Sequence, residues 1–149
     1  MLQTSSNRCA PRSKSISVYL IETSTCISII RNRLPGVLSR LQKLSADEIG
    51  ISSITAAELY HGAARSGRPE QELRRMQSLL EVLWVLNFGT SAAISYGFVR
   101  TSLERTGRAI GRFDMLIAGH ALSEGATLVT HNTREFRRVP GLAVEDWLD

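Results

Sequence analysis

Residues 17–24 read Ser-Val-Tyr-Leu-Ile-Glu-Thr-Ser, a short β-branched and aromatic run that stops at an acid. Such a run is typical of a buried strand. Apolar runs recur at 49–52, 83–86, 127–130 and 142–145, and helical patterns separate them at 25–33, 35–44, 54–65, 70–80, 90–106, 114–124 and 133–136. Because parallel strands need long crossovers, this alternation predicts an α/β fold with a parallel sheet and helices on both faces.

The composition is that of one ordinary globular domain. The chain has 149 residues, of which 43% are apolar and 21% charged, and these values exclude disordered and fibrous classes. Residues 1–16 are rich in Ser, Arg and Pro, so we expect a flexible leader or a mis-called start of translation before a domain over 17–149. With two cysteines and no run of roughly 18 apolar residues, the sequence predicts a cytoplasmic protein without a membrane span.

The net charge says little about partners. It is +4, but three of the basic residues, Arg8, Arg12 and Lys14, lie in the predicted leader. The rest of the chain is almost neutral, so any contact with nucleic acid would depend on local arginines such as Arg108 and Arg112.

Oxygen-bearing side chains follow the predicted strands where ligands gather in parallel sheets. Glu22 comes directly after the first strand, Glu58 lies in the helix after the second, Asp114 opens a late helix and Asn132 follows the fourth strand. The carboxyl ends of parallel strands meet at one edge of the sheet, so we expect these groups to converge. Such oxygens suit Mg²⁺ or Mn²⁺, and a divalent cation would neutralise their mutual repulsion.

Most of these residues also have a structural explanation. Glu58 follows Thr55 at the spacing of a capping box, and Asn132 precedes Glu135 at the same spacing. Asp114, just before an apolar run, fits a helix N-cap. Glu22 has no evident capping role, so it is the residue of the four that most strongly favours a functional site.

Other kinds of active site lack support in the sequence. His61, His120 and His131 show no paired spacing for zinc. There is no Gly-x-Ser-x-Gly turn, no cationic setting around a cysteine and no glycine-rich nucleotide loop. A phosphate-signalling receiver would need a lysine after a late strand, and none is there.

Several blocks resemble, in order and spacing, the PIN-domain toxins of VapC type. They are Tyr-Leu-Ile-Glu-Thr at 19–23, Ile-Ser-Ser-Ile-Thr-Ala-Ala-Glu-Leu at 51–59, and the segments 110–121, 128–136 and 139–147. The resemblance implies a three-layer α/β/α fold with a central parallel sheet of about five strands. It also implies an Mg²⁺- or Mn²⁺-dependent endoribonuclease toxin of a type II toxin–antitoxin system, dimeric and neutralised by a VapB-like antitoxin; several relatives cleave transfer RNA.

The resemblance also assigns roles to individual residues. Glu22 and Asp114 would bind the metal ion, Glu58 would orient the attacking water, and Asn132 would assist through its amide oxygen. Arg108 and Arg112 would hold the RNA backbone, although Arg112 could instead pair with Asp114.

One departure from the family pattern bears on activity. The family places Asp and, two residues later, Asn where this chain has Glu22 and Ser24. Glutamate is one methylene longer, and a misplacement of about 1 Å can cost on the order of a hundredfold in rate. We therefore expect a weakened enzyme or, as the alternative, an inactive homologue that mainly binds its antitoxin through the helical hairpin 54–80. Ser24 can still hydrogen-bond Glu22.

Overall fold

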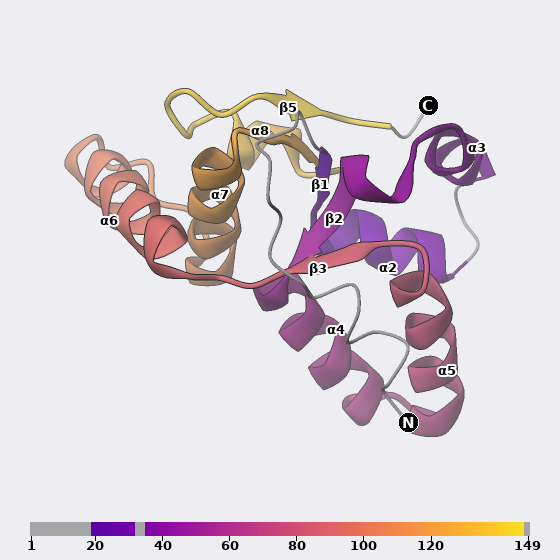
Figure 1. The fold of residues 1–149 in the computed structure, drawn as a ribbon. Helices are drawn as coiled ribbons and strands as arrows, with labels where there is room; N and C mark the ends of the chain where they lie inside the picture. The colour runs from indigo at the N-terminus through magenta and orange to yellow at the C-terminus, as the bar shows by residue number, and fades with distance from the viewer. Residues whose placement is uncertain (1–18, 32–34, 148–149) are drawn as a thin grey trace.

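The fold is a parallel β-sheet covered by helices on both faces, as predicted (Figure 1). A computed structural model describes residues 19–31 and 35–147. Its sheet has five strands in the order β3-β2-β1-β4-β5, all parallel. They are β1 Tyr19–Ile21, β2 Ile49–Ser52, β3 Trp84–Leu86, β4 Thr127–Val129 and β5 Val144–Glu145. The predicted leader, residues 1–16, lies outside the described residues.

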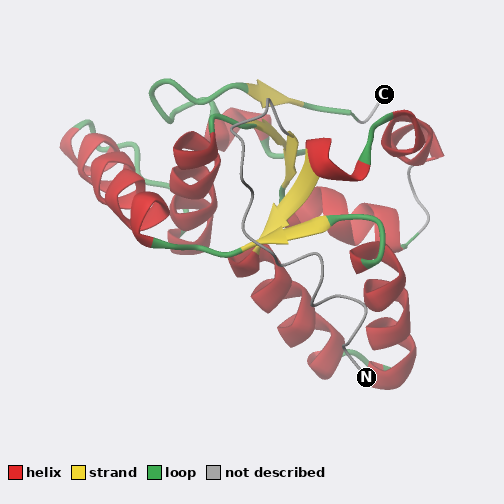
Figure 2. Ribbon diagram, in the orientation of Figure 1, coloured by secondary structure: helices red, strands yellow, loops and turns green. Residues whose placement is uncertain are grey.

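The helices fall close to their predicted positions (Figure 2). They are α2 Thr23–Ile30, α3 Pro35–Lys43, α4 Ser53–Arg65, α5 Pro69–Leu80, α6 Thr90–Arg105, α7 Arg112–Glu124 and α8 Thr133–Phe136, with a 3₁₀ turn η2 at Ala46–Glu48. Four helices begin one or two residues before the predicted start, α2, α4, α5 and α7. At α2, α4 and α7 this difference changes the environment of the candidate site. In the part of the chain described, no helix is long and apolar enough to cross a membrane.

The strand order places the candidate site at the centre of the sheet. β1 pairs with β2 on one side and with β4 on the other, with Leu20 opposite Gly50 and Leu128. The chain runs from β1 through β2 to β3 on one side and then crosses to β4 and β5 on the other side, so the strand order reverses at β1. In open parallel sheets a crevice forms at such a point, beyond the carboxyl ends of the strands. Glu22 and Thr130 follow directly after β1 and β4.

Each face of the sheet has its own apolar core. Leu20 and Leu128 are fully buried with residues of α6, α7 and α8, whereas Ile21 and Val129 are fully buried with residues of α2, α3, α4 and α5. Successive strand residues point to opposite faces, which explains this division. Because β1 and β4 are covered by helices on both faces, consecutive residues of these strands, and not only every second one, need to be apolar.

Two close contacts fix the outer layers. A Cβ atom at Gly119 of α7 would lie 2.7 Å from the backbone nitrogen of Tyr96 in α6, so only glycine permits this approach. Figure 1 shows α6 and α7 side by side on one flank, and α4 and α5 as a hairpin on the other. At the far end Trp147 is buried against Tyr19, with its ring under the guanidinium of Arg40, and these contacts hold the residues after β5 against the sheet.

Candidate functional site

Glu22 is a buried carboxylate at the junction of β1 and α2. Its side chain is only 2% exposed. The backbone N–H of Ser24 donates to Oε2 at 2.6 Å, so Glu22 is the N-cap of α2. The expectation that Glu22 has no capping role is therefore wrong, because the helix begins at Thr23 rather than near residue 25 and its first amides need acceptors.

Two hydroxyl groups also donate to Glu22. The Ser24 hydroxyl donates to Oε1 at 2.7 Å, which confirms the predicted contact. The Thr130 hydroxyl donates to the same oxygen from the end of β4. Thr130 was not singled out in the sequence, although a buried threonine directly after a strand beside β1 is the signal that would have identified it. These three donors fix the carboxylate in one position.

Glu58 lies one turn into α4 and faces α2. The N-cap of α4 is Ser52, whose hydroxyl accepts from the N–H of Ile54 at 3.0 Å. The capping box between Thr55 and Glu58 is therefore wrong, since both residues are already inside the helix. Instead, the hydroxyl of Thr23 donates to Oε1 of Glu58 at 2.6 Å. This bond joins the first turns of α2 and α4, and Thr23 is a second residue that sequence reasoning missed.

Asp114 stands in the first turn of α7 and is not its N-cap. The helix begins at Arg112 with Gly111 as N-cap, so the predicted start at Asp114 is wrong. The Gly111 carbonyl accepts the first helical bond, from Met115. Asp114 Oδ2 would lie 3.3 Å from a Cβ at position 111, so its carboxylate folds back over this glycine.

The other acids act electrostatically on Asp114. Burial, followed by the charges of Glu22 and Glu58, raises the pKa of Asp114 from 3.8 to about 6. The charge of Glu135 adds to the same shift. The charges of Glu22 and Glu58 therefore reach Asp114, and the predicted sharing of one metal ion by these acids stays a prediction.

Asn132 borders this site at the start of α8. It occupies the N-cap position, but its side chain makes no capping bond, so the capping box with Glu135 is not formed. Its backbone N–H donates at 2.9 Å to the hydroxyl of Thr130, the same hydroxyl that donates to Glu22. The side-chain amide of Asn132 is exposed and makes no capping bond, so it can contact a ligand at this end of β4.

The carboxylate oxygens of these residues suit a hard cation, although their present positions do not surround a single ion. None of the ion pairs within 19–31 and 35–147 involves Glu22, Glu58 or Asp114. Over the same residues, no three acidic, His or Cys side chains lie close enough to hold an ion as they stand. Oε2 of Glu58 and both oxygens of Asp114 accept no hydrogen bond in the described part of the chain. Carboxylate oxygens with free lone pairs are what Mg²⁺ prefers.

The predicted RNA-binding arginines are exposed. Arg108 lies between α6 and α7, and Arg112 is the first residue of α7. The alternative that Arg112 pairs with Asp114 is not observed, since the ion pairs of the described residues do not include it.

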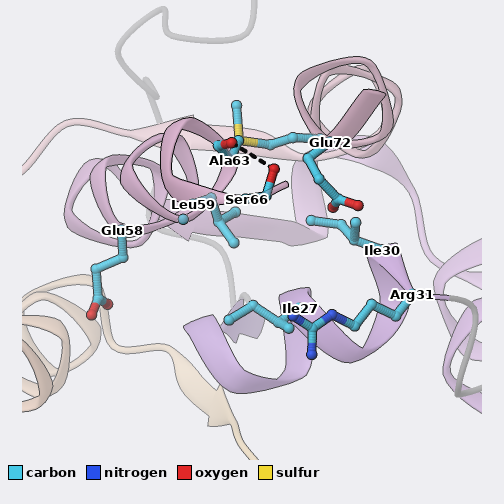
Figure 3. Close-up of a pocket in the computed structure, with 10 residues that line it drawn as sticks. Ile27, Ile30, Arg31, Glu58, Leu59, Ala63, Ser66 and Glu72 are labelled. Atoms are coloured by element: carbon cyan, nitrogen blue, oxygen red, sulfur yellow. Dashed lines mark hydrogen bonds between the residues drawn. The ribbon is translucent and has the colours of Figure 1, made fainter. Parts of the chain in front are cut away.

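A hollow not anticipated from the sequence adjoins the acids. A pocket of about 160 Å³ lies between α2, α4 and α5 (Figure 3). Figure 3 shows Glu58 at one end of it and Ile30 and Glu72 at the other. A wider hollow of about 550 Å³ shares Glu58 and Arg31 with this pocket and extends to Phe113. Of the three acids, Glu58 therefore lines both hollows, and Phe113, the neighbour of Asp114, lines the wider one.

Comparison with known proteins gives one consistent family. The PIN domain family matches residues 19–142. The chain is 42% identical over 129 residues to the tRNA(fMet)-specific endonuclease VapC of Salmonella typhimurium, covering 87% of this chain and 97% of that protein. It is 38% identical over 131 residues to Ribonuclease VapC2 of Rickettsia felis, covering 87% and 98%.

Solved structures agree with these sequence matches. The fold superposes on a chain in the crystal structure of DNA-bound VapBC from Salmonella typhimurium with a TM-score of 0.84 and 41% identity, covering 89% of this chain and 99% of that one. For VapBC2 of Rickettsia felis, bound to a DNA fragment from its promoter, the TM-score is 0.83 at 37% identity, with 87% and 98% covered. The α/β/α architecture is therefore shared over nearly the whole of those chains.

Proposed function

This chain belongs to the PIN-domain family and to its VapC branch, and on that premise we propose that it is an endoribonuclease, the toxin of a type II toxin–antitoxin pair. The substrate would be a structured RNA such as a transfer RNA, as the name of the Salmonella relative states for that protein. The observation on which the proposal depends is the match to VapC relatives over nearly their whole length. The hydrogen bonds that hold Glu22 between β1 and β4 and Glu58 against α2 support it, and the raised pKa of Asp114 agrees with acids placed near one another.

The cofactor of the proposed reaction is Mg²⁺ or Mn²⁺, held by Glu22 and Asp114. The donor set supports this assignment, because carboxylates that repel one another without a paired cation gain stability from a divalent ion. A bound ion would lower the pKa of a coordinated water and stabilise charge developing on the phosphodiester.

The residues of the chain have separable tasks in this proposal. Ser24 and Thr130 hold the Glu22 carboxylate in place. Thr23 positions Glu58, which would orient the attacking water. Asp114 must be ionised to bind a cation, so activity should rise as the pH passes about 6.

Groups at the rim would complete the site. Asn132 would assist through its amide oxygen from the end of β4. Arg108 and Arg112, both exposed, would bind the RNA backbone, and this contribution should weaken steeply with added salt.

The proposed partners are a VapB-like antitoxin and a second copy of the chain. Solved relatives at 37–41% identity are VapBC complexes. The surface of α6 exposes Ile94 and Phe98, which are 71% and 57% accessible and lie one turn apart, so it offers an apolar face for a homodimer. We place the protein in the cytoplasm, where RNA and antitoxin would both be available.

One observation favours a second candidate function, an inactive homologue that binds its antitoxin. Both oxygens of Glu22 already accept hydrogen bonds, and the described acids do not form a ready ion site. A cleavage assay on purified transfer RNA, with Mg²⁺, Mn²⁺ or chelator, decides between the two. Metal-dependent cleavage that is lost in Asp114→Asn establishes the enzyme, whereas no cleavage by the chain or by Glu22→Asp establishes the binding role.

A further inference from the structure

The wider hollow runs from the acidic site along the surface between α2 and α4. At one end it is lined by Thr23 and Glu58, and it continues past Arg31 to Arg65, with Phe113 on its border. Its volume of about 550 Å³ suits a chain segment rather than a single ion. We refer to this hollow as the α2/α4 groove.

One stripe of α4 forms a wall of the groove. Glu58, His61, Gly62 and Arg65 are spaced by three and four residues, so they lie on the same side of the helix. Arg65 is seven residues from Glu58, which places it about 10 Å further along the axis. Gly62 leaves this wall open, because a Cβ atom there would meet no atom within 4 Å.

The far part of the groove is cationic. Arg31 and Arg65 both line it, and neither guanidinium group takes part in an ion pair or hydrogen bond within residues 19–31 and 35–147. Figure 3 shows Arg31 extending from the end of α2 toward the middle of the adjoining pocket. Two guanidinium groups in one groove complement a polyanion, because each can bind a backbone phosphate.

An aromatic ring stands where this groove meets the acids. Phe113 directly precedes Asp114 in α7, lines the hollow and is 56% exposed. Exposing a phenyl ring is unfavourable in the free protein, and its open face can stack on a nucleobase. Proteins bind single-stranded nucleic acid through basic side chains placed along its phosphate backbone and aromatic side chains that stack on its bases.

We propose that the α2/α4 groove binds the nucleotides on one side of the scissile phosphate, with Phe113 stacking on a base and Arg31 and Arg65 binding backbone phosphates. This inference rests on the proposed ribonuclease function and adds the path of the single strand. It also assigns RNA contacts to residues other than Arg108 and Arg112.

The test is a binding titration with a fluorescein-labelled single-stranded oligoribonucleotide of about ten nucleotides. The background is the full chain with Asp114→Asn, so that cleavage does not interfere. Phe113→Leu should weaken binding about 5- to 100-fold, the range expected for loss of one stacked base. Its matched control is Tyr60→Leu, because Tyr60 is another exposed aromatic residue, at 38%, and it does not line the groove.

Two further variants separate steric and ionic contributions. Gly62→Leu should fill the groove and reduce affinity at least tenfold without lowering the melting temperature, since the site is spacious and glycine is a poor helix former. Gly36→Leu, equally free of contacts, is its control. Arg65→Gln should weaken binding and reduce the slope of log affinity against log salt by about 0.7, whereas Arg74→Gln on α5 should leave both unchanged.

The proposal is overturned if Phe113→Leu, Gly62→Leu and Arg65→Gln bind the oligoribonucleotide as tightly as the background does. If the same variants instead lose a co-expressed antitoxin, the groove belongs to the protein partner and the RNA assignment is likewise overturned. Cleavage by the unmodified chain is measured separately. Cleavage without any effect of the groove variants rejects only this inference, and groove-dependent binding without cleavage rejects only the proposed activity.

Discussion

Replacing Asp114 by Asn should make the protein more stable while removing its activity. The pKa of this carboxyl is raised from 3.8 to about 6 by burial and by the charges of neighbouring acids. At about 1.4 kcal/mol per pKa unit, this corresponds to a ceiling of roughly 3 kcal/mol. Because the carboxylate is partly exposed, solvent screening should reduce the gain to about 1–1.5 kcal/mol, which is about 3–6 °C in melting temperature.

The pH dependence identifies the cause. A raised acid pKa destabilises the folded state only where the carboxyl is ionised, so wild type and Asp114→Asn should have equal stability below about pH 4. The difference between their free energies of unfolding should grow as the pH rises from about 4 to about 6 and stay constant above about 7. Thermal unfolding at a series of pH values, followed by circular dichroism, measures it.

The control is Glu124→Gln at the other end of α7. Glu124 stands in the last turn of α7, away from the acids that act on Asp114, so this substitution should not reproduce the gain in stability expected for Asp114→Asn. An Asp114→Asn variant no more stable than wild type at pH 8, or one whose gain does not depend on pH, would refute the crowding of acids at this site. Added Mg²⁺ should stabilise wild type and reduce the difference, because only wild type binds the ion tightly.

Three other substitutions test the site and the fold. If the longer side chain of Glu22 displaces its carboxylate, Glu22→Asp should raise metal-dependent RNA cleavage by up to about a hundredfold; an unchanged or lower rate in a cleavage assay would contradict that displacement. Gly119→Ala places a Cβ within 2.7 Å of the Tyr96 backbone and should cost about 1–3 kcal/mol in urea unfolding; a neutral effect would mean that α6 and α7 separate freely. His120 is buried, with Nδ1 2.8 Å from the Ser52 hydroxyl, and burial lowers its pKa to about 4, so wild type should lose stability as the pH falls from about 6.5 toward 4. His120→Leu should remove this pH-dependent loss, and an unaltered profile would reject the assignment.

The fold was predictable because its signals are local and repeated. The run around Leu20 and Ile21 is apolar on both faces, and long helical patterns separate it from the next strands. Helix starts were less accurate. At α7 the sequence offered Asp114 as an obvious N-cap, whereas the structure uses Gly111, whose extended backbone and carbonyl are enough to begin the helix.

The candidate site was predictable only in part. Acids at strand ends can be read from the sequence, and the charge of Glu22 acts on Asp114 in the structure. Their hydrogen-bond partners could not be identified, because Thr23 and Thr130 are ordinary residues in a linear sequence and become important only when α4 and β4 lie beside β1 and α2. The groove was missed for the same reason, since Arg31 and Phe113 meet only in three dimensions.

The most direct test is a Mn²⁺ titration followed by electron paramagnetic resonance, in which binding removes the signal of the free ion. The carboxylate site predicts saturable binding to wild type, strong weakening in Asp114→Asn and no change in Glu124→Gln. Equal binding by all three proteins, or none by wild type at neutral pH, would contradict a shared cation at Glu22 and Asp114.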